Sequence, residues 1–410
     1  MSAFPERLVA AFGIFALIGI AWAVSRDRRR FPLRVVAWGL GLQLVLALLL
    51  LRTAPGRTFF VGVSDGVAGI VAYTDQGVRF VFGPLRDVGF SFALGVLPVI
   101  VFMGSLFGML YHLGVVQVVV RFLARGLERT MGTSGAESLS TVAEVFLGMT
   151  EAPLLIRPYL ERMTESELFT VMTAGMATVA GSVLIAYAQM LGGEFGGHLV
   201  TASLLSAPAA VLVSKVMIPE RGTPETLGQA GALVPRTTVN LIDAAAEGGL
   251  AGLRLAAFIG ALLVAFVALV ALANDFVGWL GGLAGAPGLT LQQLLGVAFA
   301  PLAWLMGVPW GEARTVGGLL GIKTVLNEFL AYRELSVLLQ QQAISPRSAV
   351  VASYALCGFA NFGSIAILIG GVGGMAPTRR HDLARLGLRA IFAGTLATCM
   401  AGCFASALLP

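Results

Sequence analysis

The stretch from Gly148 to Pro153, which reads Gly-Met-Thr-Glu-Ala-Pro, decides how this sequence folds. It places a carboxylate, a hydroxyl, a glycine and a proline between two apolar segments of about half the length of a membrane span. Ionisable residues at membrane depth are rare and usually functional. An irregular backbone there persists only where protein or a water-filled cavity satisfies it. The stretch therefore predicts a functional site inside a membrane protein.

The composition around this stretch supports a membrane location. Of the 410 residues, 57% are hydrophobic and only 12% are charged, against about 25% charged in soluble domains. Apolar runs of about 20 residues, enough to cross a bilayer, recur along the whole chain. The arginines fall between these runs, so the net charge of +5 indicates topology signals and not a nucleic-acid surface. We therefore expect an all-α integral membrane protein in a multi-pass arrangement.

Eight full spans are predicted, with other segments between them that are too polar or too short to cross. The predicted spans are 8–25, 32–52, 91–113, 166–191, 198–218, 251–279, 347–371 and 383–408. Residues 57–88, 115–131 and 236–250 fit amphipathic helices in the membrane interface, and 219–236 fits a polar loop. The three cysteines, Cys357, Cys399 and Cys403, show no metal-ligand spacing and fit small buried residues.

The arginine clusters predict an internal repeat. Arg26–Arg30 and the arginines between the last two spans lie six spans apart, so the positive-inside rule places both in the cytoplasm. The apolar segments 135–162 and 311–340 then begin and end on opposite sides of the membrane, and each precedes a span with a broken apolar pattern. This is an inverted repeat of re-entrant hairpin and discontinuous helix, which puts a transporter site at the midplane.

Several polar residues at the breaks are candidates for that site. Glu151 either accepts hydrogen bonds from a ligand or merely caps a helix or pairs with Arg157, and Thr150 either contacts a ligand or is an N-cap. In the second hairpin, Asn327 and Glu328 occupy the matching place, with Lys323 a candidate to neutralise the carboxylate.

Two further residues lie in the second broken span. Asn361 and Ser364 are three residues apart, which places them on one helix face. Amide and hydroxyl groups can donate and accept, as recognition of sugars and nucleobases requires. The alternative is that they hydrogen-bond helices to one another.

Glu144 lies seven residues, about two helical turns, before Glu151, and three roles remain open for it. It takes up a proton, it ligates a cation, or it faces solvent together with Glu137. The sequence contains no metal-binding His–Glu pair, no Gly-x-Ser-x-Gly elbow and no nucleotide-binding loop. An ion gradient is therefore the expected energy source, and no cofactor is expected.

Four motifs in order resemble the concentrative nucleoside transporter family. They are Phe146-Leu-Gly-Met-Thr-Glu-Ala-Pro-Leu-Leu-Ile-Arg-Pro-Tyr159, Met172-Thr-Ala-Gly-Met-Ala-Thr-Val-Ala-Gly-Ser-Val183, Leu326-Asn-Glu-Phe-Leu-Ala-Tyr332 and Ala355-Leu-Cys-Gly-Phe-Ala-Asn-Phe-Gly-Ser-Ile365. The resemblance implies a homotrimer in which a scaffold holds a mobile transport domain. The implied division is 1–130 and 220–285 for the scaffold, and 131–219 and 286–410 for the two halves of the transport domain.

The resemblance also implies roles for individual residues. By motif position, the nucleobase is read by Met149, Thr150, Glu151 and Val183. The ribose is held by Glu328, Asn361 and Ser364, with Phe359 packing on the nucleoside.

The chain departs from the family pattern at two of these positions. Met149 stands where the family commonly has glutamine, and a thioether is only a weak acceptor, which puts the base preference in question. Glu144 stands where sodium-coupled members have asparagine. The other implied cation ligands are retained: the carbonyls of Leu147 and Val179 and the hydroxyl of Thr178. Glu144 could complete a sodium site with Thr178, but we favour a proton, since a protonated Glu144 needs no counter-ion in an apolar site.

The sequence thus predicts a cation-coupled nucleoside importer of a bacterial-type inner membrane, and not an enzyme. A relative that carries nucleobases or modified nucleosides is the first alternative. An intramembrane enzyme with Glu151 and Glu328 as acid and base is the second.

Overall fold

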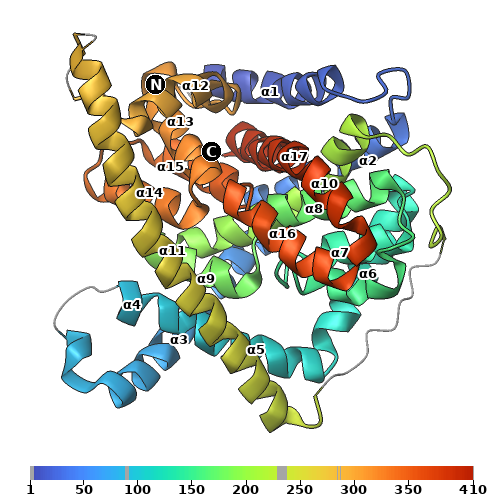
Figure 1. Ribbon diagram of the computed structural model, residues 1–410, viewed down its shortest axis with the longest axis horizontal. Coiled ribbons are helices and arrows are strands. Elements are labelled where there is room, and N and C mark those ends of the chain that lie inside the picture. The colour runs from blue at the N-terminus through green and yellow to red at the C-terminus, as the bar shows by residue number, and fades with distance from the viewer. Residues whose placement is uncertain (1–3, 88–91, 229–237, 284, 287, 410) are drawn as a thin grey trace.

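The structure is a computed structural model that describes residues 4–87, 92–228, 238–283, 285–286 and 288–409. Its described residues form helices joined by turns and loops, in agreement with the predicted all-α class (Figure 1). The first elements are α1 (Phe4–Ala23), α2 (Leu33–Arg52), α3 (Ala54–Phe82), the 3₁₀ turn η1 (Gly83–Asp87), α4 (Phe92–Gly95) and α5 (Leu97–His112). They precede two longer groups of elements that resemble each other in order.

The two groups repeat one pattern. The first contains α6 (Val115–Met131), α7 (Gly135–Ala143), the 3₁₀ helix η2 (Ala152–Tyr159), α8 (Glu165–Ala177), α9 (Gly181–Leu191) and α10 (Phe195–Met217). The second contains α12 (Leu291–Leu305), α13 (Trp310–Val325), α14 (Glu328–Gln340), α15 (Pro346–Leu356), α16 (Phe362–Met375), the turn η3 (Pro377–Arg379) and α17 (Arg380–Leu408). In each group a helix is followed by a hairpin-like pair, a broken helix and one long helix. The predicted discontinuous helices are confirmed: α8 and α9 are separated at 178–180, and α15 and α16 at 357–361.

Between the groups lies α11 (Leu241–Leu283), a 43-residue helix that runs diagonally across the molecule in Figure 1. Only 11% of its most apolar stretch is buried within the chain, against 83% for α8 with α9 and 89% for α10. A helix that is apolar all round and yet exposed belongs in lipid or against another subunit. The interior is thus formed by α8, α9, α10 and α17 of the two repeats, with α11 at the periphery.

By length and composition, seven helices of the described chain could cross a membrane, or eight if the bent pair α12 and α13 counts as one span. The predicted spans agree with these helices except at 347–371, which forms the two shorter helices α15 and α16. The prediction missed α12, whose sequence carries no charged residue and was not recognised as a separate helix. That the two hairpins turn back inside the bilayer stays a prediction.

One predicted element is wrong. A separate interfacial helix was expected at 236–250, but residues from Leu241 onward belong to α11 without a break. The stretch contains no proline, and its glycines, such as Gly248 and Gly249, are tolerated in the apolar helix, so the local sequence does not end it. Residues 229–237, including much of the predicted polar loop, lie outside the described residues.

Glycines let α11 cross α5 at very short range. A Cβ at Gly252 would lie 2.6 Å from the Ile100 carbonyl oxygen, and one at Gly104 would lie 3.1 Å from the Gly252 Cα. Gly108 and Gly248 approach each other in the same way. Each helix thus presents glycines four residues apart, the pattern that allows backbones to touch in membranes.

A buried ionic cluster joins α7, α8 and α10. Lys215 Nζ lies 2.8 Å from Glu137 Oε2 and 3.3 Å from Glu220 Oε2, while Ser134 Oγ donates to Glu167 Oε1 at 2.5 Å. Glu137 and Glu167 also complete capping boxes at the starts of α7 and α8. The cluster fixes the first hairpin to α8 and to the end of α10.

Candidate functional site

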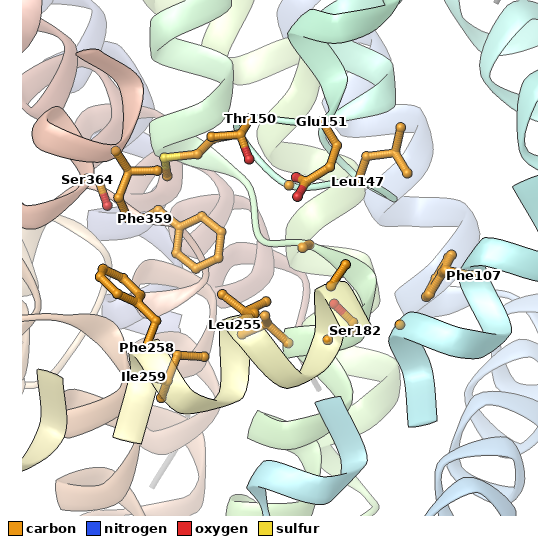
Figure 2. A pocket seen from close by; sticks show the side chains of 18 of the residues that line it. Phe107, Leu147, Thr150, Glu151, Ser182, Leu255, Phe258, Ile259, Phe359 and Ser364 are labelled. Carbon is orange, nitrogen blue, oxygen red and sulfur yellow. The ribbon is translucent and has the colours of Figure 1, made fainter. Parts of the chain in front are cut away.

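A cavity of about 620 Å³ lies where the two repeats meet α5 and α11. Its polar wall comes from the turn before η2, the breaks before α9 and α16 and the start of α14, while α11 supplies an apolar wall. Figure 2 shows Thr150 and Glu151 on one side of this cavity, with Leu255, Phe258 and Ile259 of α11 opposite. All eight residues predicted to contact substrate line it: Met149, Thr150, Glu151, Val183, Glu328, Phe359, Asn361 and Ser364.

The turn before η2 holds Glu151 at the cavity. Its carboxylate folds back over Gly148, where a Cβ would collide with Oε2. The Glu151 side chain makes no capping hydrogen bond, and no ion pair joins it to Arg157 among the described residues. The alternatives in which Glu151 caps the helix or pairs with Arg157 are therefore wrong in this structure. Its oxygens are free to accept hydrogen bonds.

Thr150 is not the N-cap of η2, a position that Glu151 occupies. Its methyl group packs against α16, because a Cβ at Gly371 would lie 2.5 Å from Thr150 Cγ2. The N-cap alternative for Thr150 is thus wrong, and the side chain is available to the cavity.

The start of α14 holds Glu328 in a donor-rich setting. Asn327 is the N-cap of α14, and its Oδ1 accepts from the Leu330 N–H at 3.0 Å. Glu328, 3% exposed, accepts from the Tyr187 hydroxyl at 2.9 Å and from Asn361 Nδ2 at 2.9 Å. The first turn of a helix also favours a negative charge. The carboxylate is thereby fixed at the cavity wall.

Asn361 joins the same network from α16. Its Oδ1 caps the helix by accepting from the Ser364 N–H at 2.9 Å, and it also accepts from Ser364 Oγ at 3.1 Å. Asn361 thus connects α16 to α14, as the helix-joining alternative expected, and it also lines the cavity, where contact with a ligand stays a prediction.

Lys323 does not pair directly with Glu328. Its fully buried ammonium donates to the Ala355 carbonyl at 2.8 Å and to Thr398 Oγ1 at 3.1 Å. Ala355 lies at the end of α15, where carbonyls lack helical partners and the helix dipole favours a cation. Lys323 therefore caps the broken helix that leads to Asn361.

Glu144 lies behind the cavity wall and is 1% exposed, as is Glu137. The alternative in which both face solvent is therefore wrong: Glu137 joins the buried ionic cluster, and Glu144 packs over Gly175 of α8, where a Cβ would lie 3.5 Å from Glu144 Oε1. That oxygen has no hydrogen-bond partner. A buried carboxylate oxygen without a partner is costly, so the position fits a bound proton or cation.

Two of the other expected cation ligands, Thr178 and Val179, lie in the break between α8 and α9. Thr178 donates its hydroxyl to the Ala174 carbonyl at 2.8 Å, which leaves the oxygen free to accept or ligate. The Gly181 N–H donates to the Phe146 carbonyl at 3.2 Å and holds the first turn against the α8–α9 break. Leu147 lines the cavity, while Glu144, Thr178 and Val179 do not. Carbonyl, hydroxyl and carboxylate oxygens suit hard cations, so the residues present also fit sodium.

Sequence reasoning missed several residues of the cavity. Phe107 and Tyr111 come from α5, Ser182 from the start of α9, and Leu255, Phe258 and Ile259 from α11. Figure 2 shows Phe107 and Ser182 at one end and Phe359 and Ser364 at the other. Ser182 is next to the predicted Val183 in the sequence, so the same motif could have indicated it. The apolar residues look like ordinary lipid-facing positions in the sequence, so no local signal distinguishes them.

The fold and the cavity define a polytopic transporter with a central polar site. A family model described as the N-terminus of Na⁺-dependent nucleoside transporters matches residues 12–85, and one described as their C-terminus matches 198–406. A third, described as nucleoside recognition, matches 93–194.

Individual relatives agree with these family models. An uncharacterised transporter of Bacillus subtilis, YutK, is 43% identical over 96% of this chain and 97% of its own. Mouse sodium/nucleoside cotransporter 1 is 41% identical over 98% of this chain, which spans 64% of that longer protein. The solved inward-facing, substrate-bound structure of CNTnw superposes with a TM-score of 0.91 at 43% identity, covering 99% of this chain and 98% of its own.

The chain belongs to the concentrative nucleoside transporter family. Members of this family are transporters, so the intramembrane-enzyme alternative is wrong, and no cofactor is implied. The family model is described as sodium-dependent, whereas this chain has a glutamate at position 144, a residue that can also bind a proton.

Proposed function

We propose that this chain is a secondary active importer of nucleosides, driven by a cation gradient. The observation that carries the proposal is the convergence of all eight predicted contact residues on one cavity. They come from four separate parts of the sequence. Residues with unrelated structural duties would not be expected to meet at one cavity.

The chemistry of the cavity suits a molecule with a hydroxyl-bearing sugar and a planar base. Glu328, Asn361 and Ser364 offer acceptors and donors for ribose hydroxyls, and Phe359 offers a ring surface near Ser364 in Figure 2. Met149, Thr150, Glu151 and Val183 form the part of the wall that we assign to the base. Arrangements of this kind, apolar with a few fixed polar groups, are typical of small-molecule sites.

For coupling we propose that Glu144 carries the ion, with Leu147, Thr178 and Val179 around it. Its unpartnered, buried oxygen needs either a proton or a metal ion. We favour the proton, because protonation removes the charge without further ligands. Sodium at Glu144 and Thr178 is the alternative, which the described oxygen ligands and the family description support.

The transport movement that we propose is elevator-like. The two repeats would carry the ligand past α11 and the other outer helices within a homotrimer in the bacterial inner membrane. The small-residue crossing of α5 and α11 supports a firm outer frame. One relative, CNTnw, has been solved in an inward-facing state and, as a double variant, in an outward-facing state, which supports alternating access.

The test is uptake of labelled uridine into proteoliposomes under an inward proton gradient and, separately, an inward sodium gradient. We expect accumulation with the proton gradient, and loss of accumulation but not of exchange in Glu144→Gln. Glu334→Gln, an exposed glutamate of α14, serves as the control. Accumulation with sodium alone would replace the proton by sodium at Glu144, and no uptake under either gradient would refute uridine as substrate.

Met149 supports a second candidate, a transporter of nucleobases or modified nucleosides. This side chain is buried in the cavity wall where the family commonly has an amide. Competition of labelled uridine uptake by free bases and by base-modified nucleosides separates the two. Stronger competition by uracil than by uridine would favour the second candidate.

A further inference from the structure

Tyr187 connects the two repeats at the centre of the molecule. It belongs to α9, in the first repeat, and its hydroxyl donates to Glu328 Oε1 of α14, in the second, at 2.9 Å. Tyr187 is fully buried and is not among the residues that line the cavity. It therefore contacts Glu328 from behind, on the side away from a ligand.

The Tyr187 ring is held firmly in this place. It stacks on Tyr332, with ring centroids 4.3 Å apart and an interplanar angle of 25°, and meets the edge of Phe329 at 4.7 Å. Tyr332 is equally buried, but its hydroxyl donates to the Ser353 carbonyl at 2.8 Å and not to Glu328. The two stacked tyrosines thus differ mainly in the acceptor that each hydroxyl contacts.

Each oxygen of Glu328 accepts from one protein donor, Tyr187 on Oε1 and Asn361 on Oε2. These two donors, one on each oxygen, fix the plane of the carboxylate. Because Glu328 lines the cavity, remaining lone pairs can accept from a ligand there. Without the Tyr187 donor, the carboxyl group could rotate, or Oε1 could hold a proton and act as a donor itself.

We propose that Tyr187 is a positioning residue, which holds the Glu328 carboxylate as an oriented acceptor for a sugar hydroxyl. This inference rests on the proposed role of Glu328 in nucleoside binding. Tyr187 contributes to selection of the sugar and not of the base, because it acts through Glu328, which we assign to the sugar. Because Tyr187 and Glu328 lie in different repeats, the acceptor is also complete only when the repeats are packed together.

The test compares Tyr187→Phe with Tyr332→Phe, each of which removes one buried hydroxyl from the same ring stack. Uptake kinetics in proteoliposomes are measured with uridine and with 3′-deoxyuridine. In Tyr187→Phe we expect KM for uridine to rise about tenfold, which corresponds to about 1.4 kcal/mol, with little change in the maximal rate. KM for 3′-deoxyuridine should change little, so the preference for uridine falls by the same factor. Tyr332→Phe should keep the wild-type preference.

Equal losses on both substrates, or equal behaviour of the two variants, would show a merely structural role and overturn the inference. If Tyr187→Phe does not fold, Tyr187→Leu, which also removes the hydroxyl donor, is measured in its place by the same criterion. Wild-type protein that takes up neither nucleoside would refute the proposed function itself, and this inference with it. Uridine uptake by the wild type with an unchanged preference in the Tyr187 variant would refute the inference alone.

Discussion

The crossing of α5 and α11 allows a prediction with a matched control on the same helix. In Gly252→Ala the new Cβ would lie 2.6 Å from the Ile100 carbonyl oxygen and 2.9 Å from the Val101 Cα. Carbon–oxygen contacts at helix interfaces are usually about 3.3–3.6 Å, so the helices must separate by about 0.7 Å. In Gly249→Ala, by contrast, the nearest atom is Ser105 Cβ at 3.8 Å, an ordinary contact.

The comparison isolates the cost of the clash. Alanine stabilises a helix over glycine by roughly 0.5–1 kcal/mol, and this gain is common to both variants. Overpacking costs about 1–3 kcal/mol and applies only to Gly252→Ala, which should therefore be less stable than Gly249→Ala by about that amount.

The assay is thermal unfolding of both variants in the same detergent, followed by uridine uptake. Because α5 and α11 both line the cavity, uptake should fall in Gly252→Ala and persist in Gly249→Ala. Equal melting temperatures for the two variants would refute the close backbone contact.

Three other substitutions test the site and its support. Glu328→Gln should abolish uridine uptake while folded protein remains in the membrane, since an amide cannot replace the carboxylate between two donors; Glu334→Gln should be silent, and wild-type uptake in the first variant would contradict the site. Met149→Gln should shift the competition profile among nucleosides by adding an amide to the base wall, and an unchanged profile would argue against base contact there. Lys215→Met should destabilise the protein by about 3–5 kcal/mol, because it leaves buried carboxylates unpaired. Adding Glu137→Gln should restore part of that loss in thermal unfolding, and a further loss would contradict the pairing.

Much of the interior was predictable because its signals are local. The polar breaks at Thr150 and Asn361 interrupt apolar runs, and a break at membrane depth needs a reason. The shared cavity then followed from the repeat. The start of α11 was mispredicted because small residues such as Ala244–Ala246 fit an interfacial helix and a membrane helix equally well.

The remaining features depend on tertiary contacts that the sequence does not encode locally. Lys323 appeared to be a partner for a nearby carboxylate, but its reach to Ala355 and Thr398 depends on the packing of α15 and α17. Nothing in the local sequence distinguishes Tyr187 from other aromatic residues, because its acceptor, Glu328, lies 141 positions further along the chain. Burial likewise excluded the solvent-facing alternative for Glu144, which the amphipathic pattern had left open.

The cavity wall contributed by α11 offers almost no side chains that can hydrogen-bond to a ligand. Apart from Glu247, its cavity-lining residues from Ala244 to Phe266 are glycine, alanine, leucine, isoleucine and phenylalanine. A ligand anchored by Glu328 and Asn361 could slide along this surface and give up contact area without breaking a single directional bond. If the ligand binds at Glu328 and Asn361 as proposed, a change of side-chain volume on α11 should alter the rate of transport more than its selectivity.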